Sequence, residues 1–224
     1  ETAMTAEFNY CRQSLFAGKD LASVEKECSS VTKKMAQNKQ IQSCLAHSSH
    51  HLIILMLSGD ARSKSPFDAF SGAFDCEINS EEDLLQHALS TGKAGVVQAI
   101  RFNRLFLAYW FKRYDEAAEM ASLYKTRMMM PLIAAYHAFF EGLTAFHFAR
   151  QAAHEPKWID IGNKVLDSYR TYASHSKWNW ENKLLLLEAE NHYSKGELDE
   201  AEQKYSAAIK SAHEHRFIHE EGLA

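Results

Sequence analysis

The chain has 224 residues, of which 46% are hydrophobic, and it carries a formal net charge of −4 at pH 7. This length and apolar content allow a sizeable core, and the mild charge without any block of lysine and arginine excludes a nucleic-acid partner. Three prolines and nine glycines are few for a β-rich protein, and the abundance of helix-forming residues predicts an all-α fold.

The first predicted part of the chain, residues 5–92, is helical. Residues 1–4 are expected to be a cloning remnant, and an amphipathic helix follows at about 7–17. Asp20 is predicted to cap the next helix, in which Val24 and Cys28 recur at helical spacing. A third helix at 41–57 is apolar almost all round at its end, so we expect it to be deeply buried.

The helical pattern is interrupted between residues 59 and 80, which we interpret as an irregular loop. Its aromatic residues Phe67, Phe70 and Phe74 predict that the loop packs against the protein. Ser80 is a predicted N-cap for a helix that runs to about Ser90 and is stopped by a glycine at position 92.

From residue 93 onward the sequence contains repeated phrases. The stretch 111–118, Phe-Lys-Arg-Tyr-Asp-Glu-Ala-Ala, is echoed at 196–201 as Gly-Glu-Leu-Asp-Glu-Ala, and the related stretch 158–166 lies between them. A period of about forty residues is typical of helical repeats, whose hairpins must stack to bury their apolar faces. We therefore predict tetratricopeptide-like hairpins at 94–127, 131–173 and 180–214, stacked in a right-handed α-α superhelix, with a further helix from 217.

The predicted helix at 131–151 combines a stripe of small residues with neighbouring large aromatic ones. Small side chains allow a close approach of another helix, so this helix is predicted to be central and packed on several sides. Gly142 lies in the middle of the stripe, and we expect Gly142→Leu to force the helices apart.

The second half of the chain resembles a known family of large signalling proteins. The residues that carry this resemblance are 183–190, Gly196, 199–201, Tyr205, 208–209 and 212–224, together with the acidic stretch 77–85. In that family an AAA/STAND-type ATPase precedes tetratricopeptide-like repeats, which are followed by GAF and histidine-kinase modules, often after a serine/threonine kinase-like domain. Since the chain starts without an initiator methionine and stops inside an expected helix, we expect it to be a piece of such a protein.

The resemblance implies a regulatory role without catalysis. The ATPase and kinase motifs of the family would lie outside this chain, and the sequence contains no phosphate-binding loop of the form G-x-x-x-x-G-K-[ST]. We therefore expect no enzyme activity and no cofactor. The expected partners are a protein or peptide, or the neighbouring ATPase and kinase domains, and an uncovered repeat face predicts a homodimer as a further form of association.

The compartment and the metal content follow from simple features. The longest apolar runs, 52–57 and 105–111, are much shorter than the roughly 20 residues of a membrane helix, and no secretion signal opens the chain, so we expect a cytoplasmic protein without membrane contact. Cys11, Cys28, Cys44 and Cys76 form no C-x-x-C pair, so we interpret them as buried reduced thiols and predict no metal site.

Several side chains are candidates for a partner or ligand surface. They are basic or aromatic residues, or histidines within aromatic surroundings, and they comprise Arg101, Arg104, Tyr136, His137, Phe140, His147 and Trp178. The alternative function is a small-molecule sensor whose aromatic and histidine-lined inner face encloses a ligand; a helical metal-dependent enzyme is a third hypothesis. For the clustered histidines His47, His50 and His51 we expect packing in preference to metal ligation.

Overall fold

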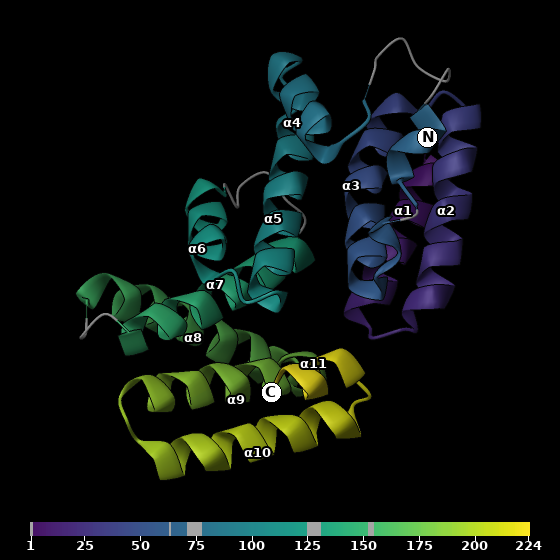
Figure 1. The fold of residues 1–224 in the computed structure, drawn as a ribbon. Helices are drawn as coiled ribbons and strands as arrows, with labels where there is room; N and C mark the ends of the chain where they lie inside the picture. The colour runs from purple at the N-terminus through teal and green to yellow at the C-terminus, as the bar shows by residue number, and fades with distance from the viewer. Residues whose placement is uncertain (1, 63, 71–77, 125–130, 152–154) are drawn as a thin grey trace. The chain divides into compact units, whose positions relative to one another are not determined.

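The computed structural model describes residues 2–62, 64–70, 78–124, 131–151 and 155–224 (Figure 1). Within these ranges the chain forms eleven α-helices and two short 3-10 helices, and no strand occurs there. The predicted all-α fold is therefore confirmed. Phe74, Cys76, His154 and the end of the first predicted hairpin at 125–127 lie outside the described residues.

The chain divides into two compact units, which we describe separately. Unit 1 comprises residues 1–104 and 124–129, and unit 2 comprises residues 105–123 and 130–224. Helix α5 (Ala94–Trp110) runs from one unit into the other. The division by packing thus falls within α5, whereas the predicted domain division lies before it, at 92/93.

Unit 1 is built on a bundle of three helices, α1 (Thr2–Phe16), α2 (Leu21–Gln37) and α3 (Ile41–Ser58), which pack against one another. α2 begins as predicted, because the Asp20 carboxylate accepts a hydrogen bond from the backbone N–H of Ser23 at 2.9 Å. α1 begins earlier than predicted and includes residues 2–4.

The segment predicted as an irregular loop contains two 3-10 helices, η1 (Asp60–Arg62) and η2 (Pro66–Phe70), both of which pack on α3. Phe67 is buried, as expected for a loop that packs down. The next helix, α4 (Glu81–Ser90), confirms its predicted cap, since the Ser80 hydroxyl accepts a hydrogen bond from the backbone N–H of Asp83 at 3.1 Å.

Unit 2 contains the second and third predicted hairpins and part of the first. After the end of α5 come α6 (Tyr114–Leu123), α7 (Pro131–Gln151), α8 (Pro156–His175), α9 (Lys177–Ser194), α10 (Leu198–Glu214) and α11 (Ile218–Leu223). Each of the two repeated phrases forms a tight turn followed by a helix. The chain reverses through a left-handed residue in both turns, Lys112 with φ of 58° and Gly196 with φ of 79°.

The helices of unit 2 pack in succession. α7 contacts α6, α8 and α9, α10 lies along α9, and α11 packs on α10 (Figure 1). Two helices approach α7 closely at Gly142. A Cβ atom on Gly142 would lie 2.7 Å from Cγ1 of Val165 and 2.9 Å from Cδ2 of Leu187. This crowding agrees with the predicted central place of α7, and the succession of hairpins is compatible with a tetratricopeptide-like superhelix.

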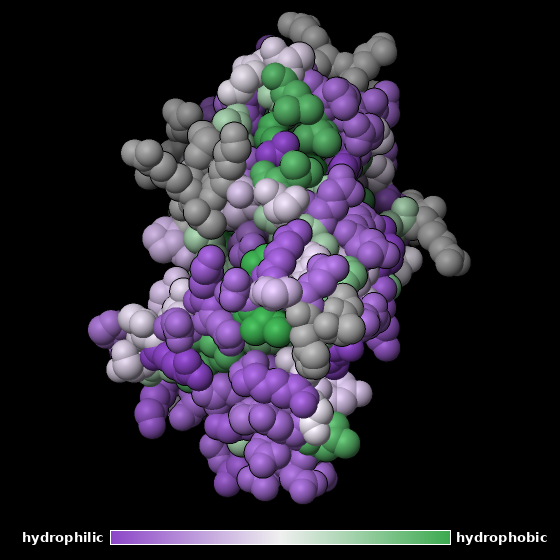
Figure 2. All heavy atoms as spheres, turned by 90° about the vertical axis from the view of Figure 1, so that its left-hand side faces the viewer, coloured by the Kyte–Doolittle hydropathy of each residue, from purple (hydrophilic) through white to green (hydrophobic). Residues whose placement is uncertain are grey.

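The outer surface of the hairpin α9–α10 is largely polar. In Figure 2 the lower part of the visible face, which these two helices form, is covered mostly by hydrophilic residues. Among the helices in the described ranges, none is long and apolar enough to serve as a membrane span.

Candidate functional site

Three of the predicted surface residues are buried in the core of unit 2. Tyr136, His137 and Phe140 all lie on α7 and are at most 5% exposed. The Phe140 ring packs edge-on against Phe106 with 5.0 Å between ring centroids. These three side chains therefore support the packing of α7 and offer no outer surface to a partner, because the aromatic face of α7 points inward.

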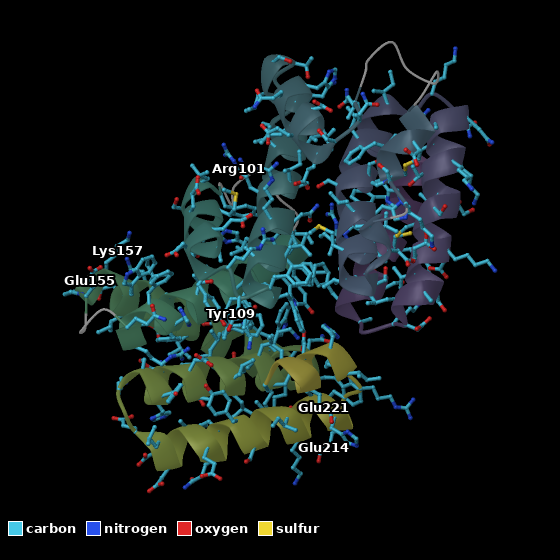
Figure 3. The ribbon with its side chains drawn as sticks, in the orientation of Figure 1. Arg101, Tyr109, Glu155, Lys157, Glu214 and Glu221 are labelled. Atoms are coloured by element: carbon cyan, nitrogen blue, oxygen red, sulfur yellow. The ribbon has the colours of Figure 1, made fainter. Side chains whose placement is uncertain are left out.

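Two of the other predicted surface residues, Arg104 and His147, already make contacts within their own units. In unit 1 the Arg104 guanidinium forms ion pairs with Glu81 at 2.9 Å and with Glu82 at 3.0 Å. Arg101 extends from α5 and is half-buried (Figure 3). In unit 2 the His147 ring stacks on Tyr114 at a centroid distance of 3.6 Å. The charge of Arg104 is thus compensated within its own unit, so Arg104 adds little net positive charge to the predicted surface.

Trp178 is the predicted residue that presents the most surface. It lies in the first turn of α9 and is 60% exposed, and its ring contacts the His215 imidazole with 4.3 Å between centroids. His215 follows directly after α10, so the contact joins the beginning of α9 to the end of α10. Nearby, His213 Nδ1 lies 3.1 Å from the Glu221 carboxylate, and Glu214 and Glu221 flank the junction of α10 and α11 (Figure 3). An exposed tryptophan held by a neighbouring ring has the properties of an anchor residue at an interface.

Unit 2 also contains a buried ionic cluster that sequence reasoning missed. The Lys183 ammonium on α9 donates hydrogen bonds to Glu220 Oε2 at 2.7 Å and to the backbone carbonyl of Asn179 at 2.9 Å. The Glu220 carboxylate, on α11, also accepts hydrogen bonds from the Tyr136 hydroxyl at 3.2 Å and from the Asn182 amide. Both charged side chains are at most 4% exposed. The cluster therefore connects α7, α9 and α11.

The surroundings of the pair combine low exposure with aromatic faces. The Lys183 ammonium lies 4.6 Å from the centroid of the Phe217 ring and 5.3 Å from that of Tyr136. Burial lowers the pKa of Lys183, and Glu220 only partly offsets this effect. Burial alone would raise the pKa of Glu220, but hydrogen bonds and charges from His219 and Lys183 outweigh it and lower the pKa. The Glu220 carboxylate is therefore ionised at neutral pH, and its ion pair with Lys183 fixes α11 to α9.

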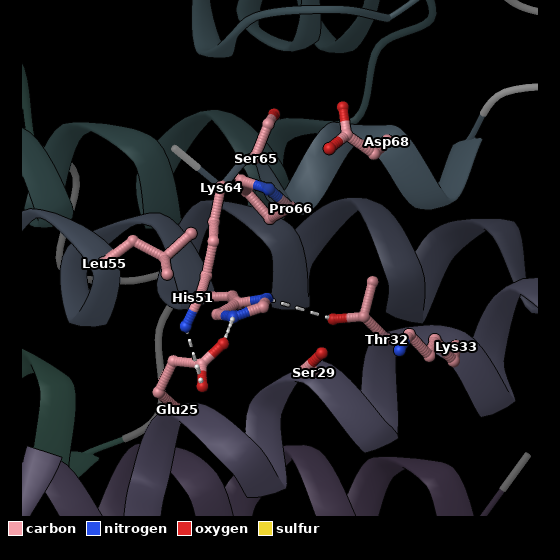
Figure 4. A pocket seen from close by; sticks show the side chains of 10 residues that line it. All are labelled: Glu25, Ser29, Thr32, Lys33, His51, Leu55, Lys64, Ser65, Pro66 and Asp68. Carbon is pink, nitrogen blue, oxygen red and sulfur yellow. Dashed lines mark hydrogen bonds and ion pairs between the residues drawn. The ribbon is translucent and has the colours of Figure 1, made fainter. Parts of the chain in front are cut away.

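Unit 1 contains a pocket of about 340 Å³ between α2, α3 and η2 (Figure 4). His51 lies at its inner end, with Nδ1 3.4 Å from the Thr32 hydroxyl and Nε2 3.7 Å from the Glu25 carboxylate. Lys64 contacts the same carboxylate at 3.5 Å. The full lining consists of Glu25, Ser29, Thr32, Lys33, His51, Leu55, Lys64, Ser65, Pro66 and Asp68.

The order carboxylate, imidazole, hydroxyl in this pocket resembles a catalytic triad, but its geometry is that of a structural cluster. The Thr32 hydroxyl donates its proton to the backbone carbonyl of Cys28 at 2.9 Å, so this proton is not directed at His51. Burial, and next the charge of Lys64, lower the pKa of His51 to about 4, which makes the imidazole a weak base. The arrangement therefore gives no support for nucleophilic catalysis by Thr32.

No family model, no curated protein and no solved structure matches this chain. The predicted resemblance to the repeat region of ATPase- and kinase-containing signalling proteins accordingly stays a prediction.

Proposed function

We propose that this chain is a non-catalytic helical-repeat module that regulates a signalling protein by binding a protein or peptide partner, or a neighbouring domain, on unit 2. The observation that carries the proposal is the recurrence of one hairpin design. Both repeated phrases form a left-handed turn and a following helix, and the later one buries its small residues Ala201 and Ala208. Stacked hairpins of this kind use their outer surfaces for recognition.

The partner surface that we propose is the exposed face around Trp178 and His215, which we call the tryptophan face. Trp178 supplies a large rigid apolar area, and the charged groups at the junction of α10 and α11 form a polar rim (Figure 3). A buried aromatic centre with a polar rim is the arrangement that concentrates binding energy in protein interfaces.

The buried ion pair between Lys183 and Glu220 holds α11 on α9 and so favours a rigid docking surface. Moving α11 away from α9 would break the hydrogen bonds that Glu220 accepts from Lys183, Asn182 and Tyr136. A partner seated on the tryptophan face therefore meets a preorganised surface, and little binding energy is lost in ordering it.

The test is a selection of peptides from a phage-displayed random library on the purified chain. We expect enriched peptides whose affinity falls at least about tenfold with Trp178→Ala, since truncating an anchor residue commonly costs more than 1.4 kcal/mol. Leu198→Ala is the matched control, because Leu198 is equally exposed at 60% but lies at the opposite end of the α9–α10 hairpin. An absence of enrichment, or equal losses in the two variants, would contradict the proposal.

The pocket of unit 1 favours a second candidate function, the binding of a small polar molecule. Its volume of about 340 Å³ lies within the usual range for ligand sites, and it presents charged groups of both signs. Thermal-shift measurements with a panel of amino acids and nucleotides test this candidate. A stabilising compound whose effect disappears in the pocket-filling variant Ser29→Trp would support it, and a panel without any shift would count against it.

A further inference from the structure

The bundle of unit 1 brings together three side chains that are separated in the sequence. Cys11 on α1, Cys28 on α2 and His47 on α3 each offer one ligand atom, and these atoms all lie within 4.8 Å of one another. All three side chains are fully buried. One residue comes from each helix of the bundle, so any group that binds all three would join the three helices at a single point.

The tautomer of His47 leaves one ring nitrogen available. Nε2 lies 3.1 Å from the backbone carbonyl oxygen of Cys28, which only accepts hydrogen bonds, so Nε2 carries the proton. Nδ1 therefore keeps its lone pair, and it is buried without a hydrogen-bond partner among the described residues. A histidine that donates one N–H to a backbone carbonyl and directs the other nitrogen to a metal is the usual arrangement in metalloproteins.

The electrostatic surroundings of the two thiols contain charges of both signs. The carboxylates of Glu7 and Glu27 act on Cys11 from α1 and α2, and the Oε2 atom of Glu27 is buried without a hydrogen-bond partner in the described part of the chain. Arg12 on α1 supplies a positive charge: its guanidinium packs 4.3 Å from the Phe8 ring and acts on His47. The unpartnered Oε2 atom adds a negative group that would attract a bound cation.

We propose that Cys11, Cys28 and His47 form a Zn²⁺ site that cross-links the three helices of unit 1. Two thiolates and an imidazole form a donor set that zinc prefers, and three protein ligands leave one tetrahedral position. His50, one turn further along α3, is buried with Nε2 unpartnered among the described residues, and a movement of its ring would supply the fourth ligand. Binding releases one proton from each thiol, and no oxidation or reduction takes part.

The experiment uses the whole chain, stripped of metal with a chelator under reducing conditions and titrated with Zn²⁺ or Co²⁺. We expect about one ion per chain, release of about two protons, a higher melting temperature, and a thiolate-to-cobalt charge-transfer band for Co²⁺. Cys11→Ser and Cys28→Ser should each reduce the Zn²⁺ affinity at least about tenfold and weaken this band, as loss of a metal ligand requires.

Cys44→Ser is the matched control. Cys44 is a free, buried cysteine of the same bundle, but its thiol contacts the backbone carbonyl of Thr32 at 3.9 Å and lies outside the cluster. This variant should keep the band and the affinity, while far-UV circular dichroism confirms that all variants remain helical. Absence of the charge-transfer band in the wild-type chain would overturn the proposal, as would a band that survives in the double variant C11S/C28S or a Cys11–Cys28 disulfide that forms in place of metal binding.

Discussion

The interiors of the two units differ in one respect: unit 2 buries a charged pair in addition to neutral polar groups such as His137. Unit 1 buries neutral groups, namely the thiols of Cys11, Cys28 and Cys44 and the histidines His47, His50 and His51, all at most 5% exposed. Burial lowers the pKa of His47 to about 4 and that of His50 well below its ordinary value, so both rings are uncharged at neutral pH. In unit 2 the charged pair is formed by Lys183 and Glu220.

This difference shows how each interior compensates its polar atoms. A neutral imidazole or thiol loses little when one hydrogen bond is missing, whereas a buried charge requires a counter-charge and several hydrogen bonds. Glu220 receives donors from Tyr136, Asn182 and Lys183, while the Nδ1 atom of His47 is left open. The ion pair of unit 2 is therefore satisfied by groups of its own unit, whereas the cluster of unit 1 retains ligand atoms for an external group.

The largest effect is expected from breaking the buried pair of unit 2. Lys183→Ala should lower the free energy of unfolding by about 3–5 kcal/mol, because it leaves the Glu220 carboxylate buried without its counter-charge. Urea denaturation followed by tryptophan fluorescence measures this change. Lys204→Ala is the control, since the Lys204–Glu188 pair at 2.6 Å is partly exposed and should contribute less than about 1 kcal/mol. Equal losses would remove the contrast between buried and exposed pairs.

Acid should destabilise both units, because each buries neutral histidines: His47, His50 and His51 in unit 1 and His137 in unit 2. The pKa of His51 in unit 1 and that of His137 in unit 2 are both lowered to about 4, mainly by burial. In the unfolded chain these rings bind protons below about pH 6.5, so stability is complete above that pH and falls as the pH decreases towards 4, by roughly 3 kcal/mol for each ring.

The two contributions can be separated because residues 110, 158, 178 and 180, the four tryptophans, all belong to unit 2. His137→Gln should reduce the fall in the free energy of unfolding that tryptophan fluorescence reports between pH 6.5 and 4. His51→Gln should reduce the acid-induced loss of stability seen by circular dichroism only in part, because His47 and His50 of unit 1 also bind protons on unfolding. If the free energy of unfolding falls with pH equally in His137→Gln and in the wild-type chain, His137 does not cause the acid destabilisation of unit 2.

Close helix packing in unit 2 should give a smaller effect. A Cβ atom on Gly162 would lie 2.5 Å from the Phe146 ring, so Gly162→Ala is expected to cost about 1–3 kcal/mol through overpacking. Gly142→Leu, at the contact of α7 with Val165 and Leu187, should cost more. Gly95→Ala on α5 is the control, because nothing lies within 4 Å of its added Cβ and alanine is the better helix former. Thermal denaturation in which Gly162→Ala loses no more stability than Gly95→Ala would contradict this packing.

The smallest effect is expected at a helix end of unit 1. Asp20→Ala removes the side-chain cap of α2 and should cost about 1 kcal/mol. Gln40→Ala, at the corresponding position before α3, should change little, because Gln40 makes no side-chain cap hydrogen bond. Denaturant titrations of the two variants compare these values, and a larger loss for Gln40→Ala would show that the caps do not set the stability of these helix ends.

Much of the fold was predictable because helices are specified by nearby residues. The caps at Asp20 and Ser80, the prolines at 131 and 156 and the left-handed glycine at 196 all mark boundaries that the structure confirms. Short 3-10 helices in the segment 59–80 were missed, since single turns have little periodicity. Among the candidate surface residues only Trp178 is mainly exposed, and the sequence could not show this, because helical spacing does not say which face meets another helix.

The sequence by itself determined the all-α class, most helix boundaries and the two hairpin turns, since each depends on hydrogen bonds and backbone preferences within a few residues. Tertiary structure alone decided which distant side chains meet. Lys183 and Glu220 are 37 residues apart, and Cys11, Cys28 and His47 come from three different helices. Their meeting depends on the angles and registers at which helices pack, which are fixed by the shapes of many side chains together.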